Sequence, residues 1–142
     1  MKTKRIHHDC VLIEDSGNLT VYVAGGEDDR KDDDGRYRYM DYLDSIESLK
    51  LIKTDINQNE WKLETTVLPT QLAHFQMVES NDKNILFYVV GGGIGINGKS
   101  DYQRKIYGLT KLKKWKEMGS LRVERYWHQT LNVPLSYLKG CK

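Results

Sequence analysis

Two spacings recur along the chain and constrain its fold more than any other sequence feature. His8 and His74 are each followed, 17 positions later, by the first residue of a Gly-Gly pair. Trp61 and Trp115 are each followed, 13 positions later, by a histidine. Because chance rarely repeats two independent spacings without a gap, the sequence indicates an internal repeat.

The repeat divides the chain into two full units and the start of a third. The units are predicted over 5–70, 71–121 and 122–133, and a tail follows at 134–142. The interval from the first glycine of the pair to the tryptophan is 36 residues in the first unit and 24 in the second, a difference of 12. The acidic segment 27–44 is therefore expected to form a long loop in the first unit.

Each full unit contains four short segments rich in apolar residues and separated by turn-forming residues, a pattern that favours β-strands. The expected strands are 9–14, 20–24, 45–52 and 60–64, then 74–79, 85–90, 105–110 and 114–118, and finally 127–133. The fold class predicted from them is all-β, with two four-stranded antiparallel sheets and one extra strand.

The order of these features resembles the kelch repeat, in which an Arg-x-x-His segment precedes an apolar strand, a Gly-Gly pair and a tryptophan. The resemblance implies an incomplete kelch-type β-propeller, although Gln71 stands where the other copies have arginine. The residues that mark the repeat, and that we expect to be structural, are Arg5, His8, Gly25, Gly26, Trp61, His74, Gly91, Gly92, Trp115, Arg125 and His128.

Each kind of marker has an expected physical role. The glycine pairs should turn the backbone with positive φ where the inner strands crowd together. The two tryptophans should fill space between neighbouring sheets, with each indole N–H bonded to an acceptor. Arg5 and Arg125 are expected to donate hydrogen bonds to loop carbonyls.

An array of two blades leaves two blade faces uncovered, whereas propellers usually close with four to eight blades. About half a dozen large side chains per face would forfeit on the order of 10 kcal/mol, comparable to the stability of a whole domain. We therefore expect the chain to need further blades or self-association for stability. A truncated remnant without activity is one alternative that this expectation leaves open.

Composition excludes several classes of protein. The longest apolar run, 85–90, is too short to cross a bilayer, and no apolar stretch follows the basic N-terminus as a secretory signal would require. Two cysteines do not supply a disulfide framework for the fold, so a cytoplasmic location is expected. The basic stretch at 111–116 fits a solvated outer strand better than a nucleic-acid surface, and neither a membrane nor a nucleic acid is the expected partner.

The sequence Gly-Ile-Gly-Ile-Asn-Gly-Lys-Ser at 93–100 matches the phosphate-binding loop pattern, with Lys99 and Ser100 as the expected contacts to phosphate and Mg²⁺. Only 42 residues follow Ser100, too few for the flanking parallel strands of such a fold. A glycine-rich blade loop is the favoured interpretation, and a nucleotide-binding fragment is kept as the alternative function.

Two metal patterns are incomplete. Asp32, Asp34, Gly35 and Asp41 partly match a calcium loop, but Arg30 occupies its first ligand position. His7, His8 and Cys10 suggest zinc, yet strand alternation points His7 away from the other two. No cofactor or metal is therefore predicted, and the absence of a catalytic motif predicts a protein that is not an enzyme.

The favoured function is recognition of a protein partner, of basic character, by loops on the rigid sheets. The resemblance suggests the substrate-recognition part of a ubiquitin-ligase adaptor, although no BTB or F-box part accompanies it here. Segment 27–44, of net charge −4 with three tyrosines, and the loop 93–104 are the expected contacts. The candidate residues are Asp28, Asp29, Arg30, Asp32, Asp33, Asp34, Arg36, Tyr37, Tyr39, Tyr42, Ile94, Ile96 and Asn97.

Overall fold

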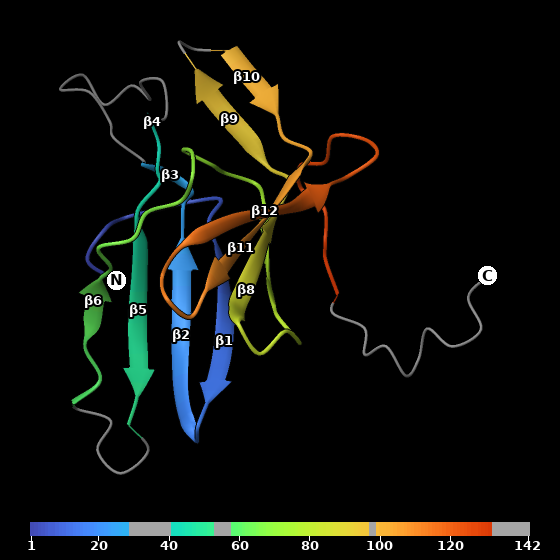
Figure 1. Ribbon diagram of the computed structural model, residues 1–142. Helices are drawn as coiled ribbons and strands as arrows, with labels where there is room; N and C mark the ends of the chain where they lie inside the picture. The colour runs from blue at the N-terminus through green and yellow to red at the C-terminus, as the bar shows by residue number, and fades with distance from the viewer. Residues whose placement is uncertain (29–40, 53–57, 97–98, 132–142) are drawn as a thin grey trace, which may run out of the picture.

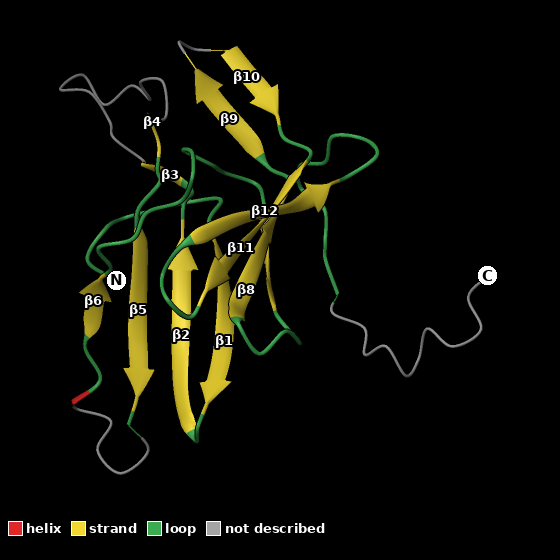
Figure 2. Cartoon of the chain, in the orientation of Figure 1, coloured by secondary structure: helices red, strands yellow, loops and turns green. Residues whose placement is uncertain are grey.

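The structure of the chain is a computed structural model that describes residues 1–28, 41–52, 58–96 and 99–131. Almost all regular structure in these ranges is β-strand (Figure 2). Among the described residues, no helix has the length and apolar character needed to span a membrane. The predicted all-β fold is confirmed.

Two four-stranded antiparallel sheets form the body of the molecule (Figure 1). The first has the order β1-β2-β5-β6, and its strands are β1 (Asp9–Asp15), β2 (Asn18–Ala24), β5 (Ile46–Leu51) and β6 (Trp61–Leu63). The second has the order β7-β8-β11-β12, with β7 (Gln76–Glu79), β8 (Ile85–Val90), β11 (Lys105–Thr110) and β12 (Trp115–Ser120). All eight strands were expected from the sequence, with ends that differ by at most two residues. The sheets are consistent with two blades of a propeller.

Two small hairpins extend from the sheets. One pairs β3 (Glu27–Asp28) with β4 (Asp41–Tyr42), and the other pairs β9 (Gly93–Ile96) with β10 (Lys99–Tyr102). Each hairpin interrupts the connection between the second and third strands of its sheet, where the sequence predicted loops. Figure 1 shows both rising from the same end of the molecule, which we call the hairpin end.

The core lies between the two sheets, since both contribute buried side chains to one apolar cluster. Strand β1 of the first sheet contacts β7 and β8 of the second. Phe87 on β8 is fully buried, and its ring lies 5.4 Å from that of Tyr22 on β2. Burial of such aromatic surface is the main stabilising term at this joint.

The glycine pairs have the conformation that the sequence predicts. Gly25 and Gly26 have φ of +57° and +91°, and Gly91 and Gly92 have +61° and +106°. A Cβ on Gly25 would lie 2.4 Å from the carbonyl oxygen of Leu72, which begins the next unit. Each pair therefore allows one sheet to approach the next closely.

The structure corrects the alignment of the second unit by one residue. The N–H of Gly26 donates to Leu72 O and that of Gly92 donates to Arg125 O, both at 2.8 Å, so Leu72, not Gln71, is equivalent to Arg125. Histidine 74 is then equivalent to His7 and Trp127 instead of His8 and His128. The physical reason lies in the hairpin that opens each sheet. Asp9 pairs with Ala24 in the β1–β2 hairpin and Gln76 pairs with Val90 in the β7–β8 hairpin, so the β1–β2 hairpin is one residue longer. Both recurring spacings therefore involve histidines that are not equivalent, and their equal lengths are a coincidence of this shift.

The tryptophan alignment is confirmed, because Trp61 pairs with Leu49 and Trp115 with Leu109 at matching positions of their sheets. The Trp115 indole fills space between the sheets as predicted. It lies edge-on to Phe87 and donates its N–H to Val67 O at 2.5 Å.

Arg5 donates hydrogen bonds to loop carbonyls as predicted, and it also forms a buried ion pair. Its guanidinium is buried, and it donates to Gly25 O at 2.8 Å and to Ser45 O at 3.1 Å. It forms an ion pair of 2.8 Å with the buried Glu47 carboxylate, a partner that the sequence did not indicate. The Arg125 side chain is exposed, and its backbone carbonyl accepts a hydrogen bond from Gly92 N–H; its role as a side-chain donor stays a prediction.

The strand expected at 127–133 is not formed in its described part, 127–131. The segment comes two residues after Arg125, whose carbonyl oxygen accepts a hydrogen bond from the N–H of Gly92 in the glycine pair of the second sheet. A strand needs a hydrogen-bonded neighbour, and a third blade would have to supply one. The described chain contains no such neighbour for this segment.

Candidate functional site

The two hairpins at the hairpin end contact each other. Strand β4 lies against β9, and a Cβ on Gly93 would lie 3.7 Å from the ring of Tyr42. The described ends of the two loops that the sequence proposed as partner contacts, 27–44 and 93–104, therefore lie together on one surface. This juxtaposition depends on the packing of the two sheets against each other, with the core between them.

The predicted contact residues have different positions on this surface. Asp28 and Tyr42 are half-buried within the first hairpin, and Ile94 packs into the core with 8% exposure. Ile96 belongs to β9, where its backbone pairs with Lys99. The remaining candidates lie outside the described residues: Asp29, Arg30, Asp32, Asp33, Asp34, Arg36, Tyr37, Tyr39 and Asn97, together with the calcium-like Gly35.

An aromatic patch lies beside the second hairpin and consists of Tyr102, Tyr126 and Trp127. The rings of Tyr102 and Tyr126 stack with centroids 4.3 Å apart and an interplanar angle of 13°. All three side chains are exposed, Trp127 by 72%. Large exposed aromatic side chains are typical anchors of protein interfaces. Sequence reasoning missed Tyr126 and Trp127, because the third unit was expected to begin a strand.

A polar cluster lies at the base of the hairpins and contains His7, Glu27 and His74. The Glu27 carboxylate bridges the imidazoles, with His7 Nδ1 at 3.3 Å from Oε2 and His74 Nε2 at 3.0 Å from Oε1. The two imidazole rings lie 4.2 Å apart. Glu27 comes from β3 of the first unit and His74 from the start of the second, so the cluster spans the joint between sheets.

The same cluster was not visible in the sequence. His7 was considered with His8 and Cys10 as a zinc set, but its imidazole lies with Glu27 and His74. Glu27 was counted among the acids of segment 27–44, yet it is buried with 3% exposure. No sequence signal could have found the cluster, since its members are 20 and 47 positions apart.

The protonation of His74 follows from its surroundings. Burial and the nearby His7 lower the pKa of His74, and the opposing effect of Glu27 does not reverse the shift. The neutral imidazole has one N–H, and Trp127 Nε1 donates to its Nδ1. The proton therefore lies on Nε2, from which it is donated to Glu27.

Segment 93–100, which matches the phosphate-binding loop pattern, has a different form. Gly93–Ile96 and Lys99–Tyr102 pair as an antiparallel hairpin, and the chain continues into β11. A phosphate-binding loop lies between a strand and the N-terminus of a helix, where backbone N–H groups gather. The hairpin supplies no such N-terminus and does not favour the nucleotide-binding alternative.

The basic stretch at 111–116 makes contacts with the first sheet. Lys111 pairs with Asp15 at 2.9 Å, and Lys113 Nζ donates to Tyr22 Oη at 3.1 Å. Lys114 and Lys116 are exposed. Two of the four lysines thus join the sheets instead of forming a free basic surface.

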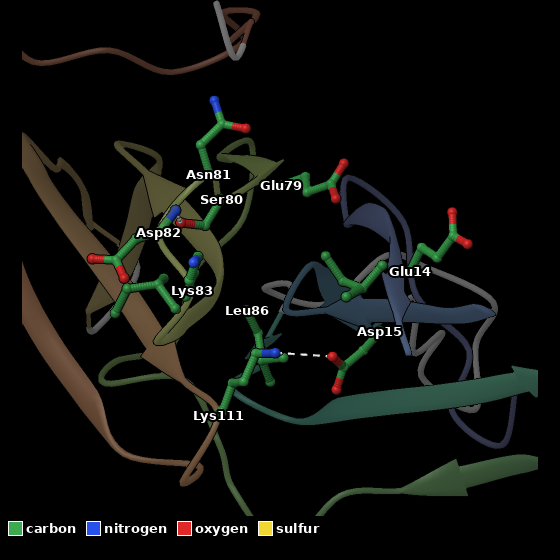
Figure 3. A pocket seen from close by; sticks show the side chains of 11 residues that line it. Glu14, Asp15, Glu79, Ser80, Asn81, Asp82, Lys83, Leu86 and Lys111 are labelled. Carbon is green, nitrogen blue, oxygen red and sulfur yellow. Dashed lines mark hydrogen bonds and ion pairs between the residues drawn. The ribbon is translucent and has the colours of Figure 1, made fainter. Parts of the chain in front are cut away.

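A cavity of about 280 Å³ opens between the sheets at the opposite end from the hairpins (Figure 3). Its walls are mostly polar side chains from the turns that join neighbouring strands. The ion pair between Lys111 and Asp15 crosses it, and Glu79 and Asp82 line its rim. These groups bring no set of convergent donors onto one point, so we assign no ligand to this cavity.

No protein-family model matches the chain, and a search of curated proteins finds no significant match. The class of protein is therefore defined by the fold alone. It is an all-β protein with repeated four-stranded antiparallel sheets, arranged as two propeller-like blades.

Proposed function

We propose that the chain is a kelch-type recognition module that binds a protein partner at its hairpin end. The observation that carries this proposal is the juxtaposition of the two hairpins with the aromatic patch on one surface. Loops on a rigid β scaffold are where binding residues concentrate. A binding role fits these exposed groups better than catalysis does.

Charge and aromatic groups have separate roles in this proposal. Seven acids of segment 27–44 remain after the buried Glu27 is set aside, and they favour a basic partner by electrostatic steering. Tyr102 and Tyr126 would supply apolar contact area at little cost in conformational entropy. The substrate-recognition part of a ubiquitin-ligase adaptor is one setting in which such a surface would act.

A comparison of variants in an affinity purification tests the proposal. Tyr102→Ala and Tyr126→Ala remove anchors at the hairpin end, while Leu112→Ala removes an exposed apolar side chain from the turn at the other end. Basic proteins retained by the wild type and by Leu112→Ala, but lost with both tyrosine variants, support the hairpin end as the binding surface. Retention that is equal for all four proteins contradicts it.

The acidic contribution has its own test. Replacement of Asp28, Asp29, Asp32, Asp33 and Asp34 by asparagine keeps the side-chain size and removes five charges. The rate at which the chain associates with a basic partner should fall and lose most of its salt dependence, because electrostatic steering by charged side chains is screened by salt. An association rate that is unchanged at low salt would argue against a basic partner.

A further inference from the structure

Three metal-ligand atoms converge in the polar cluster at the joint between the sheets. One ligand atom each of His7, Glu27 and His74 lies within 4.8 Å of the other two. His7 Nδ1 and His74 Nε2 are the nitrogens that contact the Glu27 carboxylate. Two imidazole nitrogens with one carboxylate form a donor set that suits zinc and related divalent transition metals. Calcium and magnesium prefer oxygen donors and fit this set poorly.

The charge of Glu27 is a second, independent indication of a cation. The structure contains another buried glutamate, Glu47, whose carboxylate pairs with the Arg5 guanidinium and accepts the N–H groups of Lys2 and Thr3. The Glu27 side chain is only 4% exposed, yet its side-chain partners among the described residues are two imidazoles. A buried carboxylate is costly unless a cation compensates its charge, and the described residues place neither a lysine nor an arginine against Glu27; a bound metal ion would supply a positive charge there.

We propose that His7, Glu27 and His74 bind one divalent transition-metal ion of the zinc class. The ion would join the first sheet to the second, because Glu27 and His74 belong to different units. His7 is 41% exposed in its side chain and provides the route by which the ion enters. Three protein ligands leave a fourth position for water, as in open zinc sites.

The hydrogen bond between Trp127 and His74 gives the proposed metal site a specific consequence. In the metal-free state its indole N–H donates to His74 Nδ1 and fixes the imidazole proton on Nε2. A metal ion on Nε2 displaces that proton, and the neutral imidazole then carries its proton on Nδ1, where it opposes the indole N–H. Binding therefore requires the Trp127 indole to leave His74, so the metal and this hydrogen bond exclude each other.

Titration of the purified full chain with Zn²⁺ by calorimetry, and with Co²⁺ by visible absorption, tests the proposal. We expect one ion per chain and weaker binding, by at least about tenfold, in His7→Gln and Glu27→Gln. His128→Gln alters a histidine outside the cluster and should bind as the wild type does. If Glu27→Gln does not fold, His7→Gln still decides the matter, since His7 is partly exposed.

The tryptophan gives a readout that surface binding of metal would not produce. Zn²⁺ should change the fluorescence of the wild type, and Trp127→Phe should lose that change while it binds Zn²⁺ more tightly. Weaker or equal binding by Trp127→Phe contradicts the exclusion of metal by the hydrogen bond. Absence of Zn²⁺ and Co²⁺ binding by the folded wild type, or binding that His7→Gln leaves unaltered, overturns the metal site.

Discussion

The backbone N–H of His74 donates a hydrogen bond to the carbonyl oxygen of His7 at 3.0 Å, across the joint between the two sheets. The same bond recurs one unit later, from Trp127 N–H to His74 O at 3.0 Å. All three residues have positive φ, of +53°, +56° and +49°. The three positions are equivalent, and their bonds link successive units along the inner edge of the array. The backbone of each unit is thus held in a fixed position against the unit before it.

Because successive units pack this closely, we predict that the glycine pairs tolerate no side chain. Gly25→Ala places a Cβ 2.4 Å from Leu72 O at a φ of +57°, and we expect a loss of more than about 2 kcal/mol in unfolding free energy. Gly17→Ala is the matched control, because its φ is +79° but nothing lies within 4 Å of the added Cβ. It should cost about 1–2 kcal/mol, the conformational part alone. Urea unfolding of both variants measures the difference, and equal losses would show that the close approach is unimportant.

The two tryptophans are predicted to differ although they are equivalent in the repeat. Trp115→Phe removes the indole N–H and leaves Val67 O without this donor, so we expect a loss of about 1 kcal/mol or more. Trp61 is half-buried on β6, and its indole N–H has no hydrogen-bond acceptor among the described residues. Trp61→Phe should therefore change the unfolding free energy by less. A larger loss for Trp61→Phe in chemical denaturation would contradict this assignment.

The sequence predicted the strands well because β propensity and turn residues act locally. The runs that became β2 and β8 are rich in branched and aromatic residues, and they were placed within two residues of their ends. The equivalence of His74 with His8 was wrong for a reason that is not local. It depends on the pairing register of the first hairpin and on which residue of the second unit bonds to Gly26, and both are visible only in the assembled sheets.

The candidate site was predictable only in part. The loops at 27–44 and 93–104 were identified by composition, and the structure brings their bases together at Tyr42 and Gly93. The polar cluster could not be predicted, because the burial of Glu27 and its distance to His74 arise from contacts between two units. The partner of Arg5 was missed for the same reason, since Glu47 reaches it from a strand 42 positions away.

The ion pair of Arg5 and Glu47 predicts a specific acid dependence. Burial acts to raise the pKa of Glu47, but the N–H groups of Lys2 and Thr3 and the Arg5 guanidinium together lower it below its usual 4.5. A carboxyl whose pKa is lower in the folded state stabilises the fold above its unfolded pKa, and this contribution disappears as pH falls through the folded pKa. Glu47→Gln should therefore cost about 3–5 kcal/mol near pH 7 and progressively less below pH 4.5.

Unfolding free energies measured from pH 7 to pH 3 for both proteins check this dependence. Glu14→Gln replaces an exposed glutamate on β1 and should follow the wild-type profile. A cost of Glu47→Gln that stays constant down to pH 3 would mean that the ion pair does not govern the acid sensitivity of the fold.

The open side of the second sheet predicts that the stability of the chain depends on its concentration. A hollow of about 400 Å³ there is lined mainly by apolar side chains, and Met118 and Leu131 at its margin are 45% and 83% exposed. In a closed propeller the next blade would cover this surface, and each large apolar side chain left exposed there forfeits about 1.5–3 kcal/mol. Self-association buries it, so the melting temperature should rise with protein concentration, and sedimentation should show dimers or larger species. Met118→Glu should weaken the association, whereas Leu112→Glu, on an exposed turn, should not. A monomer that melts cooperatively at one temperature over a hundredfold range of concentration would show that two blades are stable by themselves.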